Sequence, residues 1–326
     1  GKIDGRRVVS FSQDFSVFAG TMGEMHAKKI TKVVEFAEKA SLPIVGIWDG
    51  DGQRAHEGVT SLGSTGELLD ALVSCSGKVP LISIVLGTVS GTSALAAGIS
   101  DFVILGNKRG RMFMRSPYSI PEIIDGEIDE ETLGGAVQHA SRSGIACMVS
   151  NSEEEAFDMV AEILAYLPDH TMSEAPVIST GDRWDRKCKG IRKLVPEDSD
   201  SPYDIREVFN RVFDEGRFLE LFSSYAENIV IGFARLDGYS VGVIGNQPSV
   251  LAGCLDIDAS VKAARFIRTC DCFNIPLVTF VDVPGFLPGT VQEWGGIIRH
   301  GAKLLYAYAE ATVPKLTVVT RKAYGG

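Results

Sequence analysis

Two hydrophobic patterns alternate along the chain. In the first, apolar residues fall at i, i+3, i+4 and i+7, as at Ile30, Val33, Val34 and Ala37, and such a stripe predicts a helix with one buried face. In the second, a short continuous apolar run follows a proline, as in residues 43–49, which predicts a strand buried on both faces. Their alternation predicts an α/β fold with largely parallel strands and helices packed outside.

The same order of predicted elements occurs twice in the chain. The matching positions, 233 residues apart and then 234, are Asp4 and Asp237, Ile30 and Ala263, Pro43 and Pro276, Asp49 and Asp282, Pro80 and Pro314, and Gly91 and Gly325. Chance similarity between two α/β segments would reproduce the order of elements but not the register of single prolines, aspartates and glycines. We therefore predict an internal duplication of one strand–helix–strand–helix–strand unit.

A polar stretch containing several prolines separates the two copies, which is typical of a domain boundary. We expect a first domain over residues 1–170, a linker over 171–203 and a second domain over 204–326. The length of 326 residues also suits two domains better than one core.

Composition and charge argue against several classes of function. The net charge is −10 and no tract is rich in Lys or Arg, so nucleic acid is not an expected partner. No apolar run is long enough for a membrane span. The six cysteines have neither a disulfide framework nor a zinc-binding spacing, so we expect reduced thiols in a reducing compartment and no metal.

Common catalytic motifs are absent as well. Residues 58–65 have the glycine spacing of a phosphate-binding loop, but Ser64 stands where the lysine belongs. No dinucleotide-binding glycine motif or nucleophile elbow occurs. The five histidines show no ligand spacing, and we interpret His300 as structural.

The remaining candidate chemistry is the glycine turn that follows the third strand of each copy, at Gly91-Thr92 and at Gly325-Gly326. Where a glycine turn enters a helix, unpaired backbone N–H groups and the helix dipole favour a developing oxyanion. The alternative is that these glycines only make turns. No acid–base dyad accompanies them, which suits a reaction in which the substrates handle the proton themselves.

Specific segments of the chain closely resemble the carboxyltransferase (β) subunits of biotin-dependent acyl-CoA carboxylases. The similar proteins are propionyl-CoA carboxylase, methylmalonyl-CoA decarboxylase and transcarboxylase. In the second half the matching segments are residues 228–235, 245–248, 253–277, 280–289, 292–315 and 321–326. In the first half they are residues 13–15, Arg54, residues 57–58 and residues 133–144.

The resemblance implies two crotonase-like domains, the first holding acyl-CoA and the second receiving carboxybiotin. It implies transfer of a carboxyl group between carboxybiotin and the α carbon of a short acyl-CoA, propionyl-CoA or acetyl-CoA. Biotin would be carried by a biotin carboxylase/biotin carboxyl carrier partner. Two oxyanion holes would stabilise the biotin and thioester enolates. The resemblance further implies a hexamer, a dimer of trimers, in the cytoplasm or the mitochondrial matrix.

The resemblance also implies site residues. Backbone groups of Gly91, Thr92, Gly325 and Gly326 would form the two holes. The residues expected to bind acyl-CoA are Arg54, Gly87, Ser90, Ser116, Pro117, Gly134 and Gly135. Those expected on the biotin side are Asn246, Gln247, Pro248, Pro284, Gly285, Phe286, Gly295 and Gly296.

The first half departs from the family pattern at four places. Residues 90–92 read Ser-Gly-Thr for Ala-Gly-Gly, residues 49–54 read Asp-Gly-Asp-Gly-Gln-Arg for Asp-Ser-Gly-Gly-Ala-Arg, residues 113–117 end in Arg-Ser-Pro for Thr-Gly-Pro, and Cys147 replaces a histidine. Thr92 thus adds a Cβ where close approach is expected. The resemblance leads us to expect further segments before Gly1 and after Gly326, since the given sequence ends within the second turn.

Three alternative functions stay open, and these departures motivate the second of them. The chain could belong to a sodium-pump-type methylmalonyl-CoA decarboxylase, or it could be a catalytically impaired paralogue that serves assembly or biotin docking. A crotonase-type hydratase or isomerase would need a pair of carboxylates, and we interpret Asp49 and Asp282 instead as turn caps.

Overall fold

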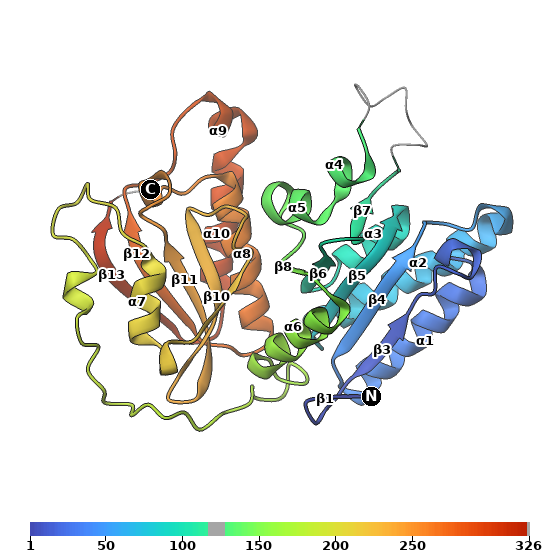
Figure 1. Ribbon diagram of the computed structural model, residues 1–326, viewed down its shortest axis with the longest axis horizontal. Helices are drawn as coiled ribbons and strands as arrows, with labels where there is room; N and C mark the ends of the chain where they lie inside the picture. The colour runs from blue at the N-terminus through green and yellow to red at the C-terminus, as the bar shows by residue number, and fades with distance from the viewer. Residues whose placement is uncertain (117–127, 325–326) are drawn as a thin grey trace. The chain divides into compact units, whose positions relative to one another are not determined.

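The chain folds into two compact units, Gly1–Ser173 and Glu174–Gly326. The computed structural model describes residues 1–116 and 128–324. Each unit is a β-sheet with helices packed against it (Figure 1). Residues 174–203, expected as a linker, group with the second unit, where Arg186 donates hydrogen bonds to the carbonyls of Arg211, Val212 and Phe213.

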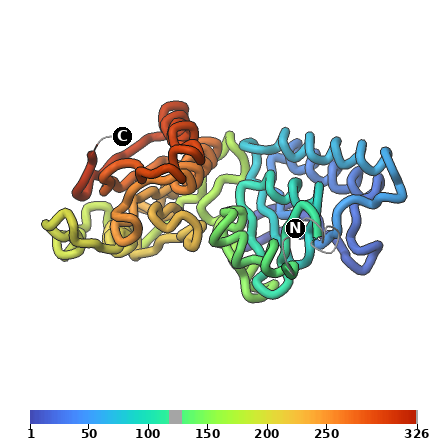
Figure 2. The backbone as a smooth tube through the Cα atoms, turned by 90° about the horizontal axis from the view of Figure 1, so that it is seen from above, coloured from blue at the N-terminus to red at the C-terminus, as the bar shows by residue number. Residues whose placement is uncertain are grey.

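The first unit is built on a parallel sheet. Its strand order is β3-β4-β5-β6-β8, with β7 paired to β5. The strands are β1 (Lys2–Ile3), β2 (Arg6–Arg7), β3 (Val9–Ser12), β4 (Ile44–Gly50), β5 (Leu81–Ser90), β6 (Phe102–Gly106), β7 (Arg111–Phe113) and β8 (Met148–Ser150). The main helices are α1 (Glu24–Ala40), α2 (Gly58–Cys75), α3 (Gly91–Gly98) and α6 (Glu153–Tyr166), with short α4 (Glu130–Gly134) and α5 (Ala136–Gln138). Helices α1 and α2 lie side by side (Figure 2).

The second unit has a mixed sheet in the order β13-β12-β11-β10-β9. Its strands are β9 (Phe218–Leu221), β10 (Ile229–Leu236), β11 (Tyr239–Asn246), β12 (Leu277–Val283) and β13 (Lys315–Ala323). Its helices are α7 (Ile205–Val212), α8 (Ile257–Cys272), α9 (Thr290–Gly295) and α10 (Ile297–Glu310). Strands β11, β12 and β13 are parallel, as predicted, whereas β9 and β10 pair antiparallel. The pairing of β10 with β11 follows from the tight turn at Asp237-Gly238, whose φ angles of 51° and 80° suit a two-residue hairpin.

Helices and strands of the two units begin, and strands pair, at residues that match at the spacing noted in the sequence. Helices α1 and α8 both begin at matching residues, and β4 and β12 match at both ends. Val9 pairs with Ile44 as Gly242 pairs with Leu277. A bulge interrupts each pair of strands at the same place, after Trp48 and after Val281. Matching positions therefore adopt matching backbone geometry.

Each unit buries its own apolar cluster. In the first, the cluster lies between the sheet and helices α1 and α2 and includes Val34, Trp48 and Leu72. In the second, Phe209, Phe213 and Phe280 pack edge-on or tilted against one another. Among residues 1–116 and 128–324, no helix combines the length and apolarity that crossing a bilayer requires.

Candidate active site

The first candidate hole lies where β5 runs directly into α3. Strand β5 ends at Ser90, and Gly91 opens the helix with φ of +57°, a backbone conformation that favours glycine. The first N–H groups of a helix have no acceptor within the helix, so those of Gly91 and Thr92 are hydrogen-bond donors at the carboxyl end of β5. The geometry is that expected of an oxyanion-binding turn.

Two side-chain hydrogen bonds connect this turn with the segment that follows β4. Ser90 Oγ donates to Asp51 Oδ1 at 2.8 Å, and Thr92 Oγ1 donates to Gln53 Oε1 at 3.0 Å. Gly52 lies between the two acceptors with φ of +67°, and a Cβ there would lie 2.9 Å from Ser90 Oγ. The segments 51–53 and 90–92 are thus held together closely.

These two pairs were missed at the sequence level. Both join residues 39 apart, and all four positions belong to the two segments that depart from the family pattern. The departures were visible as separate changes. Their common spacing of 39 was the one signal that could have suggested that they pair.

Arg54, expected to bind acyl-CoA, is engaged within the first unit. Its guanidinium donates to Thr21 O at 2.9 Å, pairs with Glu57 at 2.9 Å and lies 4.8 Å from the ring centroid of Phe18. Glu57 in turn accepts from the backbone N–H of Glu24, the first residue of α1, at 2.5 Å. In this structure Arg54 therefore ties the start of α1 to the loop after β4.

Gly87 makes room for a carboxylate. A Cβ on Gly87 would lie 1.9 Å from Asp49 Oδ1, so a side chain there would displace the Asp49 carboxylate. Burial raises the pKa of the Asp49 carboxyl, the Asp14 carboxylate raises it further, and Arg109 opposes both effects.

The matching aspartate of the second unit has a different partner. Residue 321, which matches Gly87, is an arginine, and its Nε lies 3.0 Å from Asp282 Oδ2. The side chains of Arg321 and Asp282 are 10% and 0% exposed, and Asp282 also accepts from the N–H of Lys322 at 3.2 Å. Asp282 thus belongs to a buried ion pair within the second unit.

The remaining acyl-CoA candidates gather around β7. Ser116 Oγ donates to Glu130 at 3.3 Å. Cβ atoms on Gly134 and Gly135 would lie 2.2 Å from Met112 O and from Glu131 Oε1. Because β7 pairs with the end of β5, these residues lie near the Ser90 turn. Pro117 lies outside the described residues.

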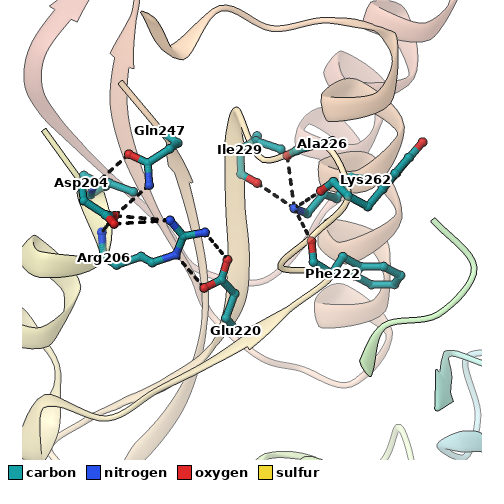
Figure 3. Close-up of polar contacts among 10 residues, drawn as sticks. Asp204, Arg206, Glu220, Phe222, Ala226, Ile229, Gln247 and Lys262 are labelled. Atoms are coloured by element: carbon teal, nitrogen blue, oxygen red, sulfur yellow. Dashed lines mark hydrogen bonds and ion pairs between the residues drawn. The ribbon is translucent and has the colours of Figure 1, made fainter. Parts of the chain in front are cut away.

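Two amides on the expected biotin side form hydrogen bonds within the fold. Asn246 Oδ1 accepts from the N–H of Asp282 at 3.3 Å, and its Nδ2 donates to Gly253 O at 3.1 Å. The buried Gln247 accepts from Ile205 N at 3.3 Å and donates to Asp204 at 2.7 Å (Figure 3). Pro248 follows and is buried. These side chains shape the end of β11.

The other biotin-side candidates lie after β12 and between α9 and α10. Gly285 and Gly296 have φ of +145° and +92°, and Pro284 and Phe286 flank Gly285. A Cβ on Gly295 would lie 2.7 Å from Ile257 Cδ1. Gly325 and Gly326 lie outside the described residues, so the second candidate hole is not described.

A buried cation next to the β9–β10 loop was also missed. Lys262 of α8 is 5% exposed, and its ammonium donates to the carbonyls of Phe222, Tyr225, Ala226 and Ile229 at 2.6–3.3 Å (Figure 3). Burial lowers the pKa of Lys262 to about 7; Glu220 and Glu227 oppose this shift, and Arg206 adds to it. Nothing in the hydrophobic pattern marked this lysine.

Within residues 1–116 and 128–324, no group of His, Cys, Asp and Glu is arranged to hold a metal ion. The six cysteines are all free thiols.

The structure is that of an α/β protein with two matching units and a glycine turn at the carboxyl end of the central strand β5 of a parallel sheet. A family model described as "Carboxyl transferase domain" matches residues 1–326. The chain belongs to this carboxyl transferase family, which confirms the resemblance noted in the sequence.

Individual relatives agree with this assignment. The methylmalonyl-CoA decarboxylase subunit alpha of Veillonella parvula is 49% identical over the whole chain, which covers 64% of that protein. The carboxyltransferase subunit of propionyl-CoA carboxylase from Haloferax mediterranei is 48% identical, with 63% covered. The crystal structure of transcarboxylase 12S, described as a hexamer with methylmalonyl-coenzyme A bound, superposes with a TM-score of 0.97 at 44% identity. It is covered over 64% of its length, so the chain spans a little under two thirds of each relative.

Proposed function

We propose that this chain forms the core of a carboxyltransferase that moves a carboxyl group between carboxybiotin and the α carbon of a short acyl-CoA. Propionyl-CoA and acetyl-CoA are the substrates we favour. The observation that carries the proposal is the Gly91-Thr92 turn at the carboxyl end of the central strand β5. The names of two relatives refer to propionyl-CoA and methylmalonyl-CoA.

The proposed reaction needs no acid or base from the protein. Carboxybiotin loses CO₂ and leaves a biotin enolate, which takes the α proton of the acyl-CoA. The thioester enolate then attacks CO₂, and its oxyanion is stabilised by the N–H groups of Gly91 and Thr92. Removing one donor from such a hole typically costs about 3 kcal/mol of transition-state stabilisation.

The proposal includes an internal duplication of a crotonase-like domain. Its support is the identical register and bulge position in the two units. We assign the acyl-CoA to the first unit, through Ser90, Gly91 and Thr92, and carboxybiotin to the second. Arg54, Gly87, Ser116, Pro117, Gly134 and Gly135 complete the proposed acyl-CoA side, and the glycine turn at Gly325-Gly326 completes the biotin side.

The proposed partners are a biotin carboxylase/biotin carboxyl carrier subunit and five further copies of this chain. The hexameric assembly of the transcarboxylase relative supports the second. Six free cysteines fit a reducing compartment, and we propose the cytoplasm or the mitochondrial matrix.

Transfer of ¹⁴C from methylmalonyl-CoA or malonyl-CoA to free biotin tests the proposal on the full-length protein. We expect transfer by the wild type and a loss of about tenfold or more in Gly91→Ala, because the added Cβ strains a left-handed backbone at the hole. Gly190→Ala is the matched control, since Gly190 is also left-handed, with φ of +80° and open space around it. Absence of transfer by a hexameric wild type contradicts the proposal. Binding of acyl-CoA in calorimetry without transfer would favour an assembly subunit instead.

A further inference from the structure

Gln53 connects the candidate hole with the interior of the first unit. Its Nε2, which carries two protons, lies within hydrogen-bond distance of Met22 O and Thr65 Oγ1, each at 3.1 Å, and of Ser61 Oγ. Its Oε1 accepts from Thr92 Oγ1 at 3.0 Å. One side chain thus joins the loop after β4, helix α2 and the second residue of α3.

The direction of these bonds follows from Met22. A backbone carbonyl can only accept, so Met22 O fixes which end of the Gln53 amide carries the nitrogen. The oxygen must then face Thr92, and the Thr92 hydroxyl must donate to it. The proton of Thr92 is therefore committed to Gln53, and the rotamer of Thr92 is held.

The anchor itself is rigid. Met22 and Ser61 are fully buried and Thr65 is 2% exposed, and Ser61 also donates to Met22 O at 2.9 Å. A side chain locked by several buried partners can hold a neighbour within a few tenths of an ångström, which is the tolerance that a preorganised site requires.

The second unit lacks this arrangement. The residue that matches Gln53 is Phe286, and the one that matches Thr92 is Gly326, and neither side chain can form the bond. The connection is therefore a feature of the first unit alone, not a requirement of the repeated fold.

We infer that Gln53 is a positioning residue for the Gly91-Thr92 hole, acting through the Thr92 hydroxyl. By fixing Thr92 it directs the backbone N–H groups at the start of α3, while Asp51 holds Ser90 on the preceding side. The inference deepens the proposed function and rests on it. It also explains how a threonine is accommodated at this turn, because its side chain has a fixed partner.

The test compares Gln53→Leu, Thr92→Val and the double variant in the full-length protein, with methylmalonyl-CoA varied and free biotin as acceptor. We expect kcat to fall about tenfold in each single variant, because a small misplacement of catalytic groups is costly, with KM changed less than twofold. The kcat of the double variant should be no lower than that of the less active single variant, since both substitutions remove the same hydrogen bond. Thr92→Ser, which keeps the hydroxyl, should restore most of kcat.

Thr31→Val is the matched control. Its hydroxyl also makes one hydrogen bond, to Ala27 O at 3.0 Å within α1, and its loss should leave kcat and KM unchanged. Additive losses in the double variant, or equal effects on kcat and KM, would overturn the inference. If Gln53→Leu does not fold, the nearly isosteric Thr92→Val decides alone.

Amide hydrogen exchange separates this inference from the proposed function. We expect faster exchange in the peptide that contains residues 91–98, to the same extent in Gln53→Leu and Thr92→Val, and no change in Thr31→Val. This readout needs no substrate. A wild type without transfer would contradict the proposed function, and unchanged exchange would separately contradict the positioning role of Gln53.

Discussion

Lys29 and Lys262 occupy matching positions on the repeated helix, yet their surroundings differ. Lys29 on α1 is exposed to solvent, whereas Lys262 on α8 is buried beneath the β9–β10 loop. Four carbonyl oxygens accept from its ammonium. The loop that connects the antiparallel strands β9 and β10 covers Lys262.

The buried lysine makes stability depend on pH. The pKa of Lys262 falls from 10.5 to about 7 on burial, so between these values the unfolded chain binds a proton that the folded chain does not. Stability therefore rises with pH in this window, by up to about 1.4 kcal/mol per pH unit. Below about pH 7 the ammonium is charged in both states and the cost of burying it is complete.

Urea unfolding of the wild type and Lys262→Met at several pH values between 7 and 10 measures this effect. The difference in unfolding free energy, wild type minus variant, should increase with pH, because other groups titrate alike in both proteins. A difference independent of pH would mean that the four carbonyls keep the ammonium charged throughout.

Helices α1 and α8 begin at matching positions but are stabilised differently at their N-termini. In α8 the first turn is capped by Asp256, whose Oδ1 accepts from Ala259 N at 2.8 Å. In α1 the matching position is Gly23, which has no side chain, and Glu57 from outside the helix accepts from Glu24 N instead. The same element thus depends on a local cap in one unit and on a tertiary contact in the other.

Asp256→Ala should destabilise the protein by about 1 kcal/mol, the usual cost of losing such a cap. Asn228 Nδ2, which donates to the same oxygen at 3.1 Å, would add to the loss. Denaturant unfolding checks the value. Asp129→Ala, which removes the cap of the five-residue helix α4, is the control and should cost less. Equal losses in the two variants would contradict a specific role for Asp256.

At the scale of the molecule, the chain divides after Ser173, and each unit has its own core. Residues 174–203 contain one short 3₁₀ turn, at Ile191–Lys193, and depend on side-chain contacts for their order. Arg186 is central among these contacts, because it pairs with Asp182 at 2.9 Å and donates to three carbonyls at the end of α7.

Arg186→Met should loosen this segment without unfolding either unit. We expect limited proteolysis to cut residues 174–190 several times faster, since these residues lie outside the apolar cluster that Ile191, Leu194, Val195 and Tyr203 join. The thermal midpoint should change little. Lys193→Met, in the same segment, is the control. If Arg186→Met resists proteolysis as well as the wild type, other contacts hold the segment.

Hydrophobic periodicity predicted the repeated strands, helices and their spacing because burial repeats with the geometry of each element. It did not predict the antiparallel β9–β10 pair, which depends on a turn and on a partner strand. In the candidate site, glycine and its spacing identified the Gly91 turn. The partners of the Asn246 and Gln247 amides within the fold could not be predicted, because a sequence does not show what an amide faces.

The sequence by itself determined the α/β class, the repeated order of elements and the family of this protein, since all three depend on residue type and spacing. Only the tertiary structure decided which matching residues share a role. Asp49 faces Gly87 where Asp282 pairs with Arg321, and Thr92 has Gln53 as its partner where the second unit has Gly326 and Phe286. Such contacts join residues about 40 positions apart, and the chain path, not local pattern, brings them together.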